Sequence, residues 1–212
     1  MDWTHAYEDP ALEANSSSNI HAKADDFSEN VSRVKQLLDL QLSDVLLDVG
    51  CHEGAYDVAL APFVAHLVGI DTCTLLIERA RAKHIENAEF QVANANILPF
   101  PNATFDKVLA SSVIQFCESL ALQEMERVLK PTGKILIQHI PNIAFRRWYL
   151  DGIGKLDKTE EEKQNIRARN EAVKWYDPKD FDCVIPDTIP YFFSVLKTPT
   201  NHDQPLRDIH VS

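Results

Sequence analysis

Short apolar segments alternate with amphipathic ones along the middle of this chain, and this alternation constrains the fold most strongly. The segments with the length and apolar content of buried strands are 44–49, 66–71, 88–94, 105–112 and 133–140. Stretches with helical spacing of apolar residues lie between them, such as 72–84, where Thr72 is the expected N-cap, and 118–130. Strands joined by helical crossovers pair in parallel. The pattern therefore predicts an α/β fold of the Rossmann-like, doubly wound type, with a mostly parallel sheet covered on both faces.

The chain changes character after Pro141. A charged segment at 157–175 predicts a long helix, and 189–197 and 205–211 predict two further strands. These two strands pair most simply as an antiparallel C-terminal hairpin, which brings the sheet to seven strands. Residues 1–30 precede the first expected helix, which begins at Val31, and no internal repeat divides the 212 residues, so a single domain is expected.

Charge and cysteine usage narrow the classes of partner. The net charge is −11 and basic residues are interspersed with acidic ones, which disfavours DNA or long RNA. No apolar run approaches the roughly 18 residues needed to span a bilayer, so no membrane partner is expected. The four cysteines and eight histidines are scattered without zinc-type spacing. This predicts reduced thiols, no metal site and a cytoplasmic location.

Two of the chain's six glycines lie close together in the segment VLLDVGCHEGAYD, directly after the first strand. Gly50 and Gly54 allow a tight turn and the close approach of a ligand, and open α/β sheets bind ligands beyond the carboxyl ends of their strands. Asp71 ends the second strand, where a carboxylate can accept hydrogen bonds from both hydroxyls of a ribose. The turn and the carboxylate together predict an adenosine-containing ligand, which on these features alone includes a nicotinamide dinucleotide.

Four segments in order, DVGCHEG, VGID, NANILPFPNATFDKVLASSVIQF and EMERVLKPTGKILI, resemble the class I S-adenosylmethionine-dependent methyltransferases, in particular the small type-11 group. The resemblance spans about residues 31–140. It implies S-adenosylmethionine as the cofactor, a methyltransferase domain at 31–212 and a lid segment at 1–30. The cofactor-binding residues that it implies are Asp48, Gly50, Cys51, His52, Gly54, Asp71, Thr72, Asn94, Ala95, Asn96 and Ser111.

The same resemblance assigns the parts of the cofactor to these residues. The turn at 48–54 would surround the methionine moiety and Asp71 would hold the ribose. Residues 94–96 would lie at the adenine, and Ser111 near the methionine amino group. Two positions depart from the family pattern. His52 replaces the middle glycine of the turn, and histidine is among the residues that tolerate a positive φ. Asn94 replaces an aspartate, and its amide oxygen can still accept a hydrogen bond without charge assistance.

The expected reaction is methyl transfer to oxygen or nitrogen of a small molecule. His139, at the carboxyl end of the fifth strand, is the candidate general base, because imidazole titrates near neutrality; the alternative is a strand-end histidine bonded to the backbone. Gln115 and Phe116 are expected to line the acceptor site. The residues Trp3, His5 and Tyr7 are expected to form a lid, and 142–154 forms either a second wall or core.

Three other functions remain as alternatives. A nicotinamide-dependent oxidoreductase would share the glycine turn but leave LPFPNATFD unexplained. A methyltransferase-like module that binds without catalysis would fit the substitutions at His52 and Asn94. A tRNA- or protein-directed methyltransferase is the third, and the net charge disfavours the tRNA version.

Overall fold

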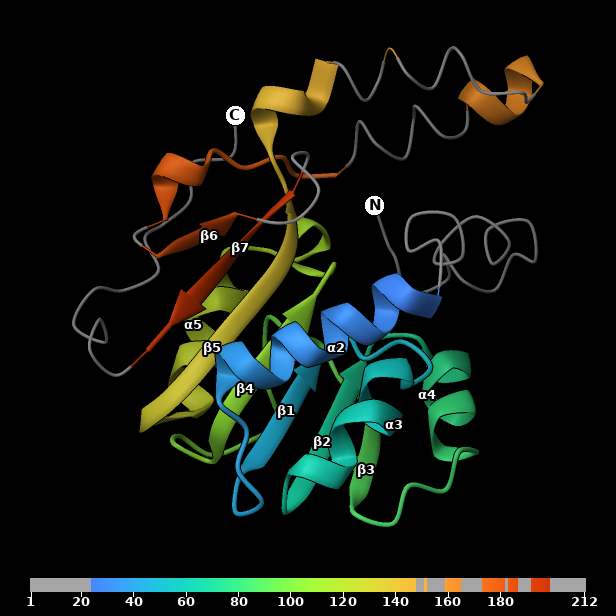
Figure 1. Cartoon of the computed structure of the whole chain (residues 1–212). Helices are drawn as coiled ribbons and strands as arrows, with labels where there is room; N and C mark the ends of the chain where they lie inside the picture. Colours follow the sequence, from blue (N-terminus) through green and yellow to red (C-terminus); the bar gives the residue numbers. More distant parts are fainter. Residues whose placement is uncertain are drawn as a thin grey trace.

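The computed structural model describes residues 24–147, 151, 159–164, 173–181, 183–186 and 192–198. These residues form a seven-stranded sheet with the strand order β3-β2-β1-β4-β5-β7-β6 (Figure 1). Its strands are β1 (Val45–Val49), β2 (His66–Asp71), β3 (Ala88–Val92), β4 (Phe105–Ser111), β5 (Leu129–Pro141), β6 (Val184–Pro186) and β7 (Phe192–Lys197). The first five are parallel, and β7 is antiparallel to both β5 and β6. The predicted fold class is confirmed.

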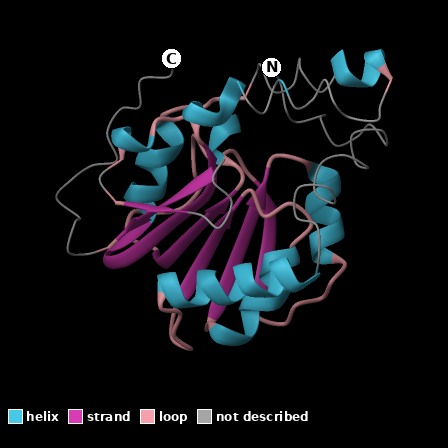
Figure 2. Cartoon of the chain, turned by 45° about the horizontal axis from the view of Figure 1, so that its top comes forward, coloured by secondary structure: helices cyan, strands magenta, loops and turns pink. Residues whose placement is uncertain are grey.

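Helices cover both faces of the sheet (Figure 2). The described part of the chain includes the α-helices α2 (Ala24–Leu38), α3 (Ala55–Leu60), α4 (Thr74–Arg81) and α5 (Leu120–Val128). Short 3-10 turns lie at η1 (Ala61–Phe63), η2 (Ile114–Phe116), η3 (Ile143–Phe145) and η4 (Pro178–Asp180). Pro62 falls in η1, directly after the end of α3, where its ring cannot continue an α-helix. None of the described helices has the length and apolar character that a membrane crossing requires.

Successive side chains of each central strand pack into different hydrophobic clusters. Leu46 of β1 packs with Val34 and Leu38 of α2, whereas Leu47 joins the cluster that contains Met125 of α5. Successive residues of a strand point to opposite faces, so a strand with helices on both sides must be apolar at every position. This explains why these segments are continuous apolar runs and why their carboxyl ends meet at one edge.

Three details differ from the sequence-based expectations. Helix α2 begins at Ala24, upstream of the predicted Val31, and its Phe27 packs against Tyr56 of α3 with ring centroids 5.2 Å apart. Thr72 does not cap α4: the N-cap position belongs to Cys73, whose side chain makes no capping hydrogen bond. The stretch 173–175, expected at the end of a long helix, is not helical.

The C-terminal antiparallel pair exists but uses different residues. Strand β7 matches the predicted 189–197, yet its partners are β5 on one side and β6 on the other. The three-residue β6 was not predicted, and the predicted pairing with 205–211 stays a prediction. The stretch 205–211 lies outside the described residues, as do the proposed lid residues Trp3, His5 and Tyr7.

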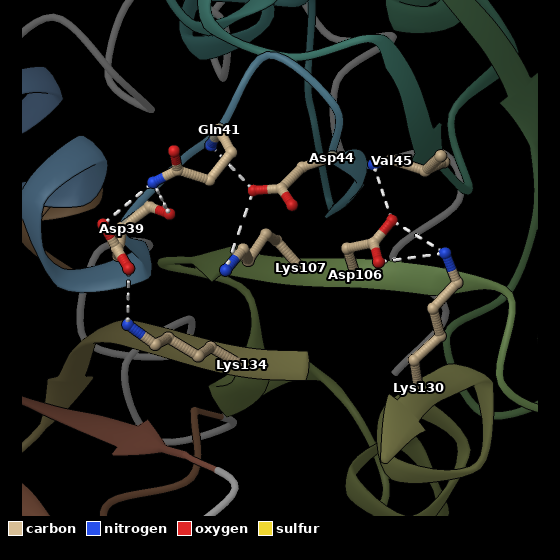
Figure 3. Close-up of polar contacts among 8 residues, drawn as sticks. All are labelled: Asp39, Gln41, Asp44, Val45, Asp106, Lys107, Lys130 and Lys134. Carbon is tan, nitrogen blue, oxygen red and sulfur yellow. Dashed lines mark hydrogen bonds and ion pairs between the residues drawn. The ribbon is translucent and has the colours of Figure 1, made fainter. Parts of the chain in front are cut away.

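Ion pairs bind the amino ends of the central strands together (Figure 3). Asp44, just before β1, accepts a hydrogen bond from the amide of Gln41 at 2.8 Å and lies 3.7 Å from Nζ of Lys107 in β4. Asp106 accepts the amide of Val45 at 3.0 Å and bonds Nζ of Lys130 at 2.8 Å. This edge of the sheet is therefore tied by its own charged side chains, and the opposite, carboxyl edge carries the polar groups described next.

Asp106 should make stability sensitive to acid. The bonds from Lys130 and the Val45 amide outweigh partial burial and lower the pKa of its carboxyl group. A carboxyl group whose pKa is lower in the folded state stabilises the fold above its unfolded pKa near 4, and this contribution is lost as the pH falls through the folded pKa. We expect Asp106→Asn to cost about 2 kcal/mol at pH 7. The cost should shrink below about pH 4 in urea titrations at several pH values; an equal cost at all pH values would contradict the assignment.

Candidate functional site

The turn after β1 has the left-handed backbone that its glycines predict. Gly50 has φ 75° and Gly54 has φ 78°, and His52 between them has φ 54°. A Cβ atom on Gly50 would come within 2.5 Å of Cγ2 of Val113, so a larger residue is excluded there on space as well as on φ. The expectation that His52 adopts an unusual backbone angle is confirmed.

Backbone hydrogen bonds fix this turn onto the end of β2. The amides of Gly50 and Cys51 both donate to the carbonyl of Ile70, at 2.8 and 2.9 Å. The His52 amide donates to Oδ2 of Asp71 at 3.1 Å, and the Cys73 amide donates to Oδ1 of the same carboxylate at 2.9 Å. Asp71 thus joins the glycine turn to the start of α4, and each of its oxygens keeps a further lone pair for a hydroxyl donor.

Two buried carboxyl groups lie in the elements that flank the turn. Asp48 of β1 is 3% exposed, and Asp57 in the first turn of α3 is fully buried. Burial raises the pKa of Asp57 to about 7. The pKa of Asp48 lies well above its ordinary range. Burial is the main cause, and the charge of Asp57 and a hydrogen bond with its carboxyl group raise the pKa further. The two groups therefore titrate as a pair and hold at least one proton near neutrality.

The Cys51 side chain is buried beneath the turn and is not exposed at this edge of the sheet. Its thiol is buried, and burial together with the nearby carboxyl groups raises its pKa far beyond the range in which a thiolate forms. Cys51 therefore contributes its backbone to the turn and has no nucleophilic role.

The three residues expected at an adenine follow β3 in a compact turn. Oδ1 of Asn94 accepts the Asn96 amide at 2.9 Å, and the Ile97 amide donates to the Asn94 carbonyl at 3.0 Å. Oδ1 of Asn96 in turn accepts the Glu118 amide at 3.0 Å, which links this turn to the segment after η2. Ala95 is buried, whereas Asn94 is exposed at the rim.

A polar cluster joins the carboxyl ends of β4 and β5. Nδ1 of His139 lies 3.4 Å from Oγ of Ser111 and 3.3 Å from Oγ of Ser112. Nε2 of Gln138 donates to the same Ser111 hydroxyl at 3.0 Å and to the Tyr56 hydroxyl at 3.1 Å. Both Ser112 and His139 have positive φ, and the register of β5 against β7 shifts between Ile137 and Ile140. The irregular backbone brings the imidazole of His139 to the serine hydroxyls at this edge.

A later segment of the chain packs against this cluster. The Tyr176 hydroxyl donates to the Ile114 carbonyl at 3.1 Å, and its amide donates to the Pro141 carbonyl at 2.9 Å. Nζ of Lys174 donates to the Cys117 carbonyl at 2.6 Å. The sequence pattern did not indicate this strap, because its partners are distant in the chain. Gln115 beneath it is buried, whereas Phe116 is 37% exposed.

The predicted cofactor residues come from different regions of the chain and meet at this edge. They follow or end β1, β2, β3 and β4, and His139 and Gln138 add the end of β5. Thr72 lies half-buried beside Asp71, and Arg146 and Arg147 are exposed. Sequence reasoning missed Asp57, Tyr56, Gln138 and Tyr176; the only signal was a single aspartate in the otherwise apolar stretch AYDVAL.

The sheet order, the glycine turn and the carboxylate at the end of β2 define a Rossmann-like nucleoside-binding domain. Residues 47–137 match the family profile described as a methyltransferase domain. This match and the fold support a relation of the chain to the class I S-adenosylmethionine-dependent methyltransferases.

Known proteins resemble part of the chain. An uncharacterized methyltransferase of Bacillus subtilis, YcgJ, is 32% identical over 98 residues, which cover 43% of this chain and 39% of the relative. A malonyl-[acyl-carrier protein] O-methyltransferase of Erwinia billingiae is 31% identical over 93 residues, covering 43% and 37%. These matches span less than half the length of either relative.

A solved structure extends the likeness in fold. The structure of a SAM-dependent methyltransferase from Aquifex aeolicus aligns with a TM-score of 0.58 at 19% identity, covering 89% of this chain and 97% of that one. The shared architecture therefore extends beyond the residues that the family profile matches.

Proposed function

We propose that this protein transfers the methyl group of S-adenosylmethionine to an oxygen or nitrogen atom of a small molecule. The observation that carries the proposal is the position of Asp71. Its carboxylate lies at the end of β2, bonded to the amides of His52 and Cys73, where a ribose with two hydroxyl donors would complete its hydrogen bonding.

The residues at this edge fit the other parts of the cofactor. Asp48 and Asp57 supply negative charge for the methionine amino group, since the pair retains one ionisable carboxylate near neutrality. In the turn at 94–96, Oδ1 of Asn94 keeps a second lone pair that can accept the adenine amino group. Gly50 and Gly54 adopt positive φ and carry no side chain, which leaves the turn open where the methionine moiety would lie.

The bound cofactor supplies a methyl group on a positively charged sulfur. Asp71 and the turn at 48–54 would hold the cofactor while this methyl group passes to the acceptor atom and the C–S electron pair stays on sulfur. An acceptor hydroxyl must also lose a proton, and we assign its removal to His139. The imidazole is 7% exposed and lies at the correct edge of the sheet, beside the Ser111 and Ser112 hydroxyls. The chain's main contribution is positioning, which can supply about 7–11 kcal/mol in well-oriented systems.

A small acceptor agrees with the charge of the chain. A net charge of −11 disfavours a nucleic acid. The malonyl-[acyl-carrier protein] O-methyltransferase among the relatives methylates oxygen, which supports an oxygen acceptor without identifying it. The cytoplasmic location stays a prediction from the sequence.

Transfer of a radiolabelled methyl group into a metabolite extract tests this function. We expect labelled small molecules in the presence of the protein and S-adenosylmethionine, and none after heating the protein. Stabilisation by NAD without stabilisation by S-adenosylhomocysteine would contradict the proposal and favour an oxidoreductase. Binding of S-adenosylhomocysteine without transfer into small molecules, proteins or tRNA would indicate a non-catalytic module.

His139→Asn tests the assignment of the base. Asparagine tolerates the positive φ of this position but cannot take up a proton near neutrality. For a hydroxyl acceptor we expect kcat to fall by about 100-fold or more. The dissociation constant for S-adenosylhomocysteine should change by less than about twofold, because the imidazole acts on the acceptor. A loss of cofactor affinity with kcat retained at saturation would contradict the assignment.

A further inference from the structure

Asp57 is a buried acidic side chain that takes no part in the methyl-transfer step itself. It lies in the first turn of α3, with no exposed surface, and apart from the Asp48 carboxyl group no other described residue donates to its oxygens. Its carboxyl group shares a hydrogen bond with that of Asp48, whose side chain reaches the same buried region from β1. A buried carboxylate without donors is costly, so this arrangement calls for a specific role.

Two carboxyl groups in hydrogen-bonding contact cannot both be ionised, because the bond between them requires a proton. When both groups are protonated, the pair is neutral and has no attraction for a cation. When one proton leaves, the pair carries one negative charge and one remaining hydrogen bond. A cationic group placed beside Asp48 would stabilise the second form.

We propose that Asp48 and Asp57 form a proton-linked site for the cationic amino group of the methionine moiety, so that the protein releases a proton when it binds the cofactor. This inference rests on the proposed function for the identity of the ligand. It adds that Asp57 is a positioning residue that acts through Asp48 and makes cofactor affinity depend on pH.

The other charged groups around the pair fix the sign of this dependence. Asp71 of β2 opposes ionisation of Asp48, and Lys83 after α4 favours ionisation of Asp57. Neither reverses the effect of burial, and the Asp57 carboxyl group has a pKa of about 7. The Cys51 thiol stays protonated throughout this range.

His52 would act in the opposite direction. Its Nδ1 lies 4.0 Å from Oε1 of Glu53 at the rim of the turn. If protonation of this imidazole governed binding, a ligand carboxylate would bind more tightly as the pH falls. The carboxyl pair makes binding weaker as the pH falls, because the released proton competes with the cationic ligand. The sign of the pH dependence therefore separates the two residues.

The free protein offers a readout that needs no cofactor. Carboxyl groups whose pKa is raised by folding stabilise the fold while they are protonated, and that stability is lost as the pH rises from about 4 through the folded value. The wild type should therefore lose stability between about pH 4 and pH 7 through this pair. Asp57→Asn removes one titrating group and lets an amide donate to Asp48. Its melting temperature should rise relative to the wild type by several degrees between about pH 5 and pH 8.

Calorimetric titration with S-adenosylhomocysteine tests the proposal between about pH 5.5 and pH 8. For the wild type we expect affinity to rise by up to about tenfold per pH unit below pH 7, and heats in buffers of different ionisation enthalpy to show close to one proton released per ligand. The affinity of the Asp57→Asn variant should change by less than about twofold per pH unit. At the lowest pH this variant should bind the ligand more tightly than the wild type does. Asp57→Ser provides a smaller second variant, and Asp39→Asn, near the amino edge of the sheet, should behave as the wild type.

The outcomes distinguish this inference from the function on which it rests. Absence of binding at every pH would contradict the methyltransferase assignment itself, whereas the melting curves of the free protein would still report on the pair. Binding with no proton release and the same pH profile in the wild type and Asp57→Asn would overturn the proton-linked site and leave the function intact. Affinity that rises as the pH falls would assign the dependence to His52 instead.

Discussion

Asp71→Ala is expected to lower the affinity for S-adenosylhomocysteine by about 100-fold or more. Two ribose hydroxyls that donate to a carboxylate contribute about 1.5–3 kcal/mol each, and a loss of about 3 kcal/mol corresponds to roughly 100-fold. The substitution also removes the acceptor for the amides of His52 and Cys73, which hold the glycine turn against α4. The substitution therefore removes the direct contact with the ribose and also weakens the geometry of the loop. Calorimetric titration measures the resulting dissociation constant.

Asp106→Ala is the matched control for this experiment. Asp106 is also an aspartate that accepts a backbone amide, that of Val45, but it lies at the amino ends of the strands (Figure 3). Its removal should lower stability and leave cofactor affinity within about twofold, since distant sites without shared partners act independently. Equal losses of affinity in both variants would show that general destabilisation, and not the ribose contact, explains the effect.

Lys107→Ala is expected to destabilise the fold by about 3–5 kcal/mol, because it leaves the charge of Asp44 buried without its partner. The side chains of Lys107 and Asp44 are only 9% and 10% exposed, and their charged atoms lie 3.7 Å apart. Asp44 keeps the hydrogen bond from the Gln41 amide, which does not neutralise the carboxylate. Urea denaturation at pH 7 measures the loss in free energy of unfolding.

Lys134→Ala gives the contrast on the same face of the network. Lys134 pairs with Asp39 at 3.6 Å, but the Asp39 side chain is 66% exposed, so water replaces the lost partner. We expect a cost below about 1 kcal/mol. A cost for Lys107→Ala no greater than that for Lys134→Ala would mean that burial does not determine the strength of these pairs.

The central sheet could be predicted because its determinants are local. Continuous apolar runs mark strands that are buried on both faces, and each run in the first two thirds of the chain became a strand. The turn at Gly50 and Gly54 and the positive φ of His52 follow from residue types with known backbone tolerance. Asp71 could be placed at the ligand edge because it ends a strand whose direction was known.

Features set by tertiary contacts could not be predicted in the same way. Strand β6 has three residues, too few to show a period, and exists because β7 offers it an edge. Asp57 resembles any polar residue in an amphipathic helix, and its burial depends on which face of α3 turns towards β1. The strap at Lys174 and Tyr176 bonds residues that precede it by more than thirty positions, so no local pattern marks it.

A crystal structure with S-adenosylhomocysteine bound tests the central claim most directly. We expect the nucleoside to lie across the carboxyl ends of β1, β2 and β3, with its ribose hydroxyls within hydrogen-bonding distance of the Asp71 carboxylate and its amino group beside Asp48. A ligand bound elsewhere on the protein, or a ribose that makes no contact with Asp71, would contradict it.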